Sequence, residues 1–175
     1  MGVVRPITDR NVLEQMKEHM RERSTRNYLI FRVGLNLGLS VQDILNLKVE
    51  DLLNKEVFNC QKWGICISDS LQKEVRNYVG ERTSGYLFIS STGKQLSRFQ
   101  LYGILRSAAR AANFEGPIGA VTLRKTFAYW AYMEKQIYLP LLSKYLNHST
   151  VQYTLYYMGI EEQEIHEENL TAVDL

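Results

Sequence analysis

Cysteine is scarce in this sequence, with only Cys60 and Cys66 among 175 residues. A single pair of thiols in a chain without an export signal is typical of reduced packing residues, and it excludes a disulfide framework or a zinc site built on cysteine. Long hydrophobic runs are also missing, since no stretch of eighteen apolar residues occurs and the first residues contain no apolar segment. We therefore expect no membrane span and no secretory signal, and a cytoplasmic protein.

The motifs of common catalytic sites are absent as well. The sequence contains no Gly-rich phosphate loop, no nucleophile-elbow motif and no cluster of metal ligands, so that no cofactor and no metal is expected. With 45% hydrophobic and 23% charged residues, the chain carries enough apolar side chain for a large core, which excludes an intrinsically disordered protein. One domain over residues 1–175 is the expected organisation.

Charge is distributed unevenly along the chain. Residues 160–175 contain six acidic residues and no lysine or arginine, which leaves 21 basic and 13 acidic residues in the rest of the sequence. A basic body favours an anionic partner such as nucleic acid, although an ordinary solvated surface can have the same composition. The acidic end carries Ile160, Ile165 and Leu170 at helical spacing, which predicts a helical tail over 160–175 with a docking or shielding role.

Helix signals dominate the remaining sequence. Gly38 is placed to end a helix in the left-handed conformation, and Ser40 with Asp43 has the pattern of a capping box. A largely buried helix is predicted over residues 122–136, and shorter helices are expected from Pro140 and from Ser149. Capping residues precede five amphipathic stretches, at Thr8, Ser24, Ser40, Asp69 and Ser97.

Strand signals are few and short. Val57-Phe58 and the apolar run from Ile65 to Ile67 flank Gly64 in the pattern of a hairpin with the glycine at its turn. A further short strand is predicted from Tyr86 to Ile89. The predicted fold class is mostly α with a small antiparallel β-sheet (α+β).

Three segments carry a recognisable constellation: residues 38–48 (GLSVQDILNLK), 121–128 (VTLRKTFA) and 146–157 (LNHSTVQYTLYY). In order and spacing, with a hairpin between the first two, they resemble the catalytic domain of the tyrosine recombinases, the phage integrase family. The resemblance covers roughly residues 8–165. It includes no counterpart of the N-terminal core-binding domain that most such enzymes use to complete a clamp around DNA.

The resemblance implies attack of a tyrosine on a DNA phosphodiester, with a 3′-phosphotyrosyl intermediate whose formation needs fixed cations around the phosphate. Tyr157 takes the place of the nucleophile, nine residues after His148, which matches the second histidine of the family. Arg124 matches the second arginine. Lys62, in the hairpin turn, matches less closely the lysine that acts as acid on the leaving 5′ oxygen. Arg124, Lys125 and Lys62 are also expected to contact DNA.

Two positions depart from the family pattern. Ser40 stands in the place of the first arginine, and Val121 stands where a histidine is expected three residues before Arg124. Lys125 replaces a residue that is often histidine in the family, and it could supply a donor near the site. An arginine from elsewhere in the sequence, such as Arg26 or Arg32, could replace the missing one in space.

Each matched residue also has an ordinary structural interpretation. Tyr157 could pack in the core beside Tyr156, and His148 could cap or pack at a helix end. Lys62 at a hairpin tip could be merely solvated, and Ser40 could be a helix cap alone. Arg124 differs, because a charge among mostly apolar neighbours needs a partner or an anion.

Three functions follow from these alternatives. The first is a recombinase that acts in site-specific DNA recombination or integration through Tyr157, with activity reduced by the residues at Ser40 and Val121. The second is a catalytically inactive DNA-binding regulator or accessory factor with the recombinase fold. A protein-interaction module without a DNA role is the third. Expected partners are double-stranded DNA, further copies of the chain bound through the tail, and a partner recombinase; the gene would belong to a mobile element.

Overall fold

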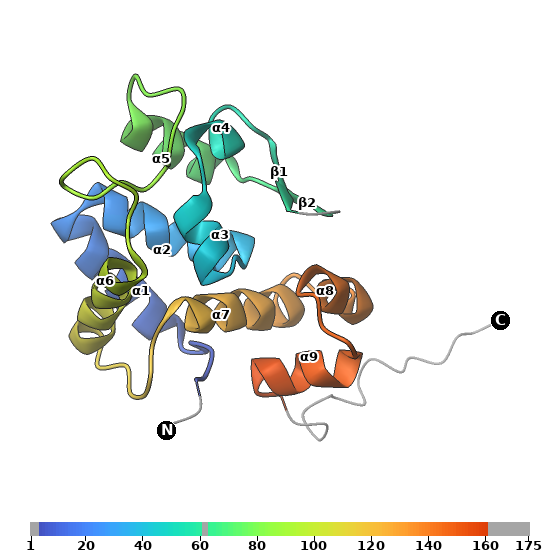
Figure 1. The fold of residues 1–175 in the computed structure, drawn as a ribbon. Coiled ribbons are helices and arrows are strands. Elements are labelled where there is room, and N and C mark those ends of the chain that lie inside the picture. The colour runs from blue at the N-terminus through green and yellow to red at the C-terminus, as the bar shows by residue number, and fades with distance from the viewer. Residues whose placement is uncertain (1–3, 61–62, 161–175) are drawn as a thin grey trace.

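The computed structural model of the chain describes residues 4–60 and 63–160. This part is mostly helical with a two-stranded antiparallel sheet, which confirms the predicted fold class (Figure 1). In chain order, the elements are α1 (Arg10–Arg23), α2 (Thr25–Leu37), α3 (Val41–Asn46), α4 (Val49–Leu52), β1 (Val57–Cys60), β2 (Trp63–Cys66), α5 (Asp69–Val79), α6 (Arg98–Ala111), α7 (Ala120–Met133), α8 (Leu139–Tyr145) and α9 (Val151–Met158).

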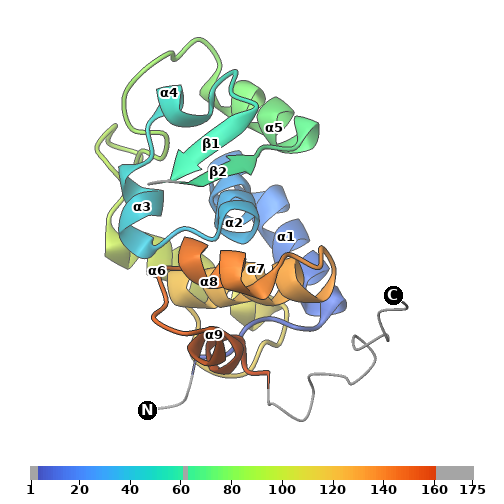
Figure 2. The ribbon, with the colours of Figure 1, turned by 90° about the vertical axis from the view of Figure 1, so that its right-hand side faces the viewer.

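Helix α7 runs through the middle of the molecule and separates α9 from the β1–β2 hairpin (Figures 1 and 2). Its first half, through Ala120 and Leu123, belongs to a large hydrophobic core with residues of α1 to α6. Its second half, through Ala128 and Ala131, belongs to a smaller cluster with α8 and α9. Arg124 therefore lies on the helix that joins the two cores, next to the boundary between them.

Local capping signals place several helix ends where the sequence predicts them. The side chains of Ser24 and Ser97 accept hydrogen bonds from backbone N–H groups in the first turns of α2 and α6. Gly38 ends α2 with φ of +57°, and a Cβ atom at this position would overlap the ring of Phe127 on α7. Only glycine allows both the turn and this close approach, so residues 38–40 are held directly against α7.

The hairpin differs from its prediction in the position of Gly64. β1 and β2 pair antiparallel with Val57 opposite Cys66 and Gly64 opposite Asn59, so Gly64 lies within β2 and not at the turn. A Cβ atom on Gly64 would lie 2.7 Å from Cγ1 of Val57. The glycine therefore makes room for a side chain of the partner strand. Residues 61–62, which separate the strands in the sequence, lie outside the described residues.

Two predicted helix caps are wrong by one residue. The cap of α1 is Asp9 and not Thr8, because the Asp9 carboxylate accepts a hydrogen bond of 2.7 Å from the backbone N–H of Asn11. The cap of α5 is Ser68 and not Asp69, which instead occupies the first turn of the helix. In both cases a second capping residue type stands beside the predicted one, and the structure uses the neighbour.

The predicted strand from Tyr86 to Ile89 does not form. Tyr86 and Ile89 each take part in an isolated bridge, to Lys48 and to Gln95, and no ladder connects them. The predicted helical tail lies, apart from the buried Ile160, outside the described residues. Among the helices that the structure describes, none is long and apolar enough to cross a membrane.

Candidate active site

Helix α9 carries Tyr157 in its last turn. Thr150 caps the start of α9, where its hydroxyl accepts a hydrogen bond of 3.0 Å from the backbone N–H of Tyr153. Gly159 ends the helix in the left-handed conformation, with φ of +76°. Tyr157 is half-buried, while three neighbours on the helix form its buried face: Thr154, Leu155 and Met158.

His148 packs against the ring of Tyr157. The two ring centroids lie 4.7 Å apart with an interplanar angle of 64°, and His148 also meets Tyr153 edge-on at 4.8 Å. Nδ1 of His148 lies 3.0 Å from the hydroxyl oxygen of Thr154, and that hydroxyl donates to the backbone carbonyl of Thr150. Because the Thr154 proton goes to Thr150, its oxygen accepts from Nδ1–H, which leaves Nε2 as the free acceptor of a neutral imidazole.

The surroundings of His148 favour that neutral form. Burial lowers the pKa of His148 below its ordinary value of 6.5, and the positive charge of Arg124 lowers it further. Both effects disfavour a second proton on the ring. At neutral pH, the side chain beside Tyr157 is therefore an uncharged imidazole that can accept a proton.

Arg124 brings a fixed positive charge to the same place. It lies half-buried in α7, and its Nη2 donates a hydrogen bond of 3.0 Å to the backbone carbonyl of Leu146. Burial raises the pKa of the Tyr157 hydroxyl, the charge of Arg124 acts in the opposite direction, and Tyr153 raises it again. The structure thus brings Arg124, His148 and Tyr157 together, as the sequence predicts; their catalytic roles stay predictions.

Lys125 contacts Tyr157 from α7. Its Nζ lies 4.8 Å from the centroid of the Tyr157 ring, within the range of a cation–π interaction. The side chain is half-buried, and burial lowers the pKa of the ammonium group. Lys125 is therefore near the candidate nucleophile, and its contact with DNA stays a prediction.

Ser40 is engaged as a helix cap. Its hydroxyl donates to Oδ2 of Asp43 at 2.6 Å, and the backbone N–H groups of both residues bond to the partner's side chain. This is the predicted capping box at the start of α3. The segment that holds it packs on α7 through Gly38 and Phe127, one turn beyond Arg124. Ser40 supplies no cation there, and its match to the first arginine of the family stays a prediction.

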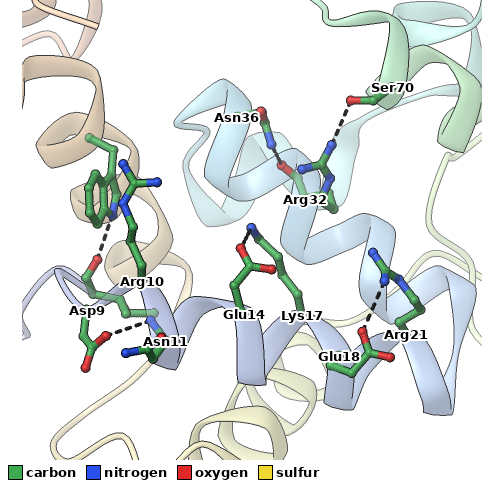
Figure 3. A network of polar contacts seen from close by, with 12 residues as sticks. Asp9, Arg10, Asn11, Glu14, Lys17, Glu18, Arg21, Arg32, Asn36 and Ser70 are labelled. Atoms are coloured by element: carbon green, nitrogen blue, oxygen red, sulfur yellow. Dashed lines mark hydrogen bonds and ion pairs between the residues drawn. The ribbon is translucent and has the colours of Figure 1, made fainter. Parts of the chain in front are cut away.

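Both alternative arginines are hydrogen-bonded to groups outside the site. Arg26 donates to the backbone carbonyl of Ile89 at 2.8 Å and to the side chain of Asn27. Arg32 pairs with Glu74 at 3.1 Å and donates to Ser70, as Figure 3 shows for the second contact. Both guanidinium groups are thus committed to other partners.

The last two predicted positions give no further catalytic group in the described structure. Val121 lies in the first turn of α7 with 46% of its surface exposed, and its side chain has no polar atom. Lys62 lies outside the described residues. Across residues 4–60 and 63–160, no group of three or more histidine, cysteine, aspartate or glutamate side chains is placed to hold a metal ion.

Two residues of the site were missed by the sequence analysis. Tyr153 precedes Tyr157 by one helical turn, and this spacing would have placed both rings on one face of α9. Thr154 orients His148, but nothing in the sequence separates this threonine from an ordinary core residue. Its role depends on how the segment before α9 folds back on the helix.

Comparisons with known proteins show the family to which the chain is similar. Residues 7–164 match the model of the phage integrase family. The chain is 38% identical over 170 residues to the probable integrase/recombinase YoeC of Bacillus subtilis (strain 168), with 93% of each chain covered. It spans only 43% to 57% of the length of four further curated relatives, which include archaeal and bacterial tyrosine recombinases.

Solved structures show the same fold. The crystal structure of XerA recombinase superimposes with a TM-score of 0.75 at 19% identity, over 96% of this chain and 64% of that one. The XerH site-specific recombinase bound to difH substrate gives a TM-score of 0.68 at 20% identity, over 95% of this chain and 54% of that one.

Proposed function

The chain belongs to the phage integrase family, and on this premise we propose that it binds duplex DNA and breaks and rejoins strands through Tyr157. The observation that carries the proposal is the contact of Tyr157 with a neutral His148 beside the charge of Arg124. This combination supplies a nucleophile, a proton acceptor and a phosphate ligand at one place. DNA-bound XerH, which has the same fold, supports the choice of substrate.

The proposed step is a transfer of a phosphoryl group to tyrosine. The Tyr157 oxygen forms a bond to phosphorus while the bond from phosphorus to the 5′ oxygen breaks, so the phenol loses a proton and the 5′ oxygen gains one. His148 can accept the first proton at Nε2, and Lys62 is the predicted donor of the second. Arg124 binds the non-bridging oxygens, whose charge grows in the transition state. Attack of a 5′ hydroxyl on the phosphotyrosine then rejoins a strand.

Ser40 and Val121 stand where the family has an arginine and a histidine, and the loss of these two groups favours a slow reaction. Each preorganised donor that is missing from a transition state costs roughly a hundredfold to a thousandfold in rate. Arg26 and Arg32 are bound elsewhere, so Arg124 is the guanidinium group that the described residues bring to Tyr157. A partner recombinase that supplies the missing groups would therefore be needed for full activity.

A specific observation favours the alternative function, an inactive DNA-binding regulator. Ser40 is not merely a replaced arginine but one half of an intact capping box, so that this position serves the fold. A protein that only binds DNA would keep such a cap and lose the cation without cost. It would have no reason to keep the arrangement of His148, Thr154 and Tyr157, which is why we favour the enzyme.

The exposed face of α6 is the proposed DNA-contacting surface outside the site. It presents three arginines and two aromatic rings to solvent: Arg98, Phe99, Tyr102, Arg106 and Arg110. Phe99 is 85% exposed, and Arg106 lies over the ring of Tyr102 at 5.4 Å. Arginines that alternate with exposed aromatics suit phosphates and base edges. A DNA substrate also agrees with the predicted cytoplasmic location and with an origin in a mobile element.

Covalent trapping tests the proposal. A pool of nicked duplexes with randomised sequence is incubated with the chain, and covalent protein–DNA complexes are recovered under denaturing conditions and sequenced. We expect a complex that disappears in Tyr157→Phe and persists in Tyr156→Phe, a matched control because Tyr156 is 73% exposed on the same helix. DNA binding without any covalent complex would support the regulator instead.

Self-association through the tail is a separate proposal. Ile160 is buried against the smaller core, and six acidic side chains follow it in the sequence. Acidic residues beside an apolar stripe suit a basic neighbour. Sedimentation on DNA should show a smaller assembly after deletion of residues 161–175, and identical assemblies would mean that the tail acts within one chain.

A further inference from the structure

The ring of Tyr157 is contacted by side chains from two segments that are far apart in the sequence. His148, from the segment before α9, packs against it at a centroid distance of 4.7 Å. Lys125, from α7, places Nζ 4.8 Å from the same centroid. The two contacts restrain the ring at the end of a helix of only eight residues.

We propose that Lys125 is a positioning residue for Tyr157, whose ammonium group holds the phenol ring against His148 and keeps a positive charge beside it. The inference rests on the proposed function of Tyr157 as nucleophile. It assigns to Lys125 a contact with the nucleophile in addition to any contact with DNA.

The surroundings of Lys125 are unfavourable for its positive charge. The side chain is half-buried, and no carboxylate of the described residues forms an ion pair with it. Burial without a counter-ion destabilises an ammonium group, and it lowers the pKa of Lys125 accordingly. The electron-rich face of Tyr157 is the group that compensates for part of this loss.

The same contact favours ionisation of the tyrosine. A phenolate ring is richer in electrons than a phenol ring, so a cation above the ring attracts the ionised form more strongly. The groups that face Tyr157 are Arg124 and Lys125 from α7, His148 from the segment before α9, and Tyr153 from α9 itself. Burial raises the pKa of Tyr157 and the charge of Arg124 lowers it. On our proposal, the ammonium group of Lys125 over the ring acts in the same direction as Arg124.

Substitutions of Lys125 separate the effect of its charge from the effect of its side-chain shape. Lys125→Met keeps the length of the side chain and removes the charge, and Lys125→Arg keeps a cation that also stacks on aromatic rings. Lys125→Gln replaces the methionine variant if that one does not fold. Lys135→Met, at an exposed position just beyond the end of α7, is the matched control.

The first readout does not require catalysis. In protein labelled with ¹³C at the tyrosine ζ carbon, the Tyr157 signal is assigned by its loss in Tyr157→Phe and followed with pH. We expect the pKa of Tyr157 to be higher in Lys125→Met than in the unmodified chain, and to stay close to its original value in Lys125→Arg and Lys135→Met. An unchanged titration in a folded Lys125→Met protein would overturn the inference.

The second readout is the rate of covalent trapping in a single turnover as a function of pH. A cation–π contact worth about 0.5 to 2 kcal/mol corresponds to a rate lower by about twofold to thirtyfold in Lys125→Met at neutral pH. The rate should recover as the pH rises and should be rescued by Lys125→Arg. Equal losses in the arginine and methionine variants would overturn the positioning role. If the unmodified chain traps no DNA, the proposed function fails, whereas the titration still decides the role of Lys125.

Discussion

Arg124 donates a hydrogen bond from Nη2 to the backbone carbonyl of Leu146, two residues before His148, at a distance of 3.0 Å. The bond ties α7 to the segment that leads into α9. It also occupies one edge of the guanidinium group and leaves the others for an anion. The protein itself therefore sets the orientation of Arg124, as its proposed role in binding a phosphate requires.

Arg124→Lys should retain the charge but lose activity. An ammonium group cannot bind the Leu146 carbonyl and also present a planar fork to two phosphate oxygens. We expect covalent trapping to fall by about a hundredfold or more, with little change in the free energy of unfolding. Trapping assays together with urea denaturation measure both. Undiminished trapping would show that Arg124 is not a ligand of the phosphate.

Thr154→Val should remove the hydrogen bond that orients His148. The substitution keeps the shape of the buried side chain but leaves Nδ1–H of His148 without its acceptor. A buried donor without a partner costs about 1 to 3 kcal/mol of stability, and a shifted imidazole lowers trapping by about tenfold to a hundredfold. Thr154→Ser retains the hydroxyl and should behave like the parent. Equal behaviour of the two variants would mean that the hydrogen bond does not orient His148.

Stability should depend on the protonation of His148. Because burial and Arg124 lower its pKa in the folded chain, the unfolded chain binds more protons over the range from the ordinary value of 6.5 down to the lowered folded value. The contribution of His148 to the free energy of unfolding is complete above that pH range and is lost as the pH falls through it. Chemical denaturation at a series of pH values should show a shallower acid-side decline for His148→Gln. The same decline in both proteins would contradict the neutral imidazole.

Ser40→Arg should restore the missing cation. If the rest of the site is intact, the new guanidinium group raises trapping by tenfold or more, while Tyr157→Phe abolishes trapping in either background. The substitution also removes the capping box of α3, at a cost of about 1 kcal/mol, so the unfolding transition is measured first. A folded variant that traps no more DNA than the parent would favour the regulator.

DNA affinity should fall steeply with salt, because arginine and lysine release counterions from the phosphates they neutralise. Arg106→Ala on the exposed face of α6 should reduce the slope of log affinity against log salt by about 1. Arg76→Ala, at an exposed position on α5, should leave the slope unchanged. Fluorescence anisotropy at several salt concentrations measures the slopes. Equal slopes for all three proteins would exclude α6 from the interface.

The sequence predicts those parts of the fold that depend on local chemistry. The caps at Ser24, Ser40 and Ser97 and the left-handed Gly38 follow from the needs of free backbone groups within one turn. The predicted position of Gly64 in the hairpin was wrong, because the need for a glycine arises in the partner strand. The side chain of Val57 occupies the space that a Cβ atom at position 64 would fill. A contact across a sheet leaves no signal in the segment itself.

The candidate site also has a part that the sequence predicts and a part that it does not. The grouping of Tyr157, His148 and Arg124 was predicted because their spacing matches a family pattern. Lys125 was expected to supply a donor near the site, but its contact with the ring of Tyr157 was not predicted. The hydrogen bond from His148 to Thr154 was not predicted either, since each contact depends on the angle at which one segment meets another. The commitment of Arg26 and Arg32 to other partners likewise required the packed structure.

The division of the apolar interior along α7 has a consequence for motion. The smaller cluster holds α8 and α9 through few buried side chains, whereas the larger one holds most of the chain. Segments with few buried contacts open at a lower free energy than the whole protein unfolds. Release of the smaller cluster would carry Tyr157 away from Arg124 while α6, the proposed DNA-contacting helix, stayed folded. Amide protons of α9 should therefore exchange with solvent faster than those of α2, and a local equilibrium would govern the exposure of Tyr157, the proposed nucleophile.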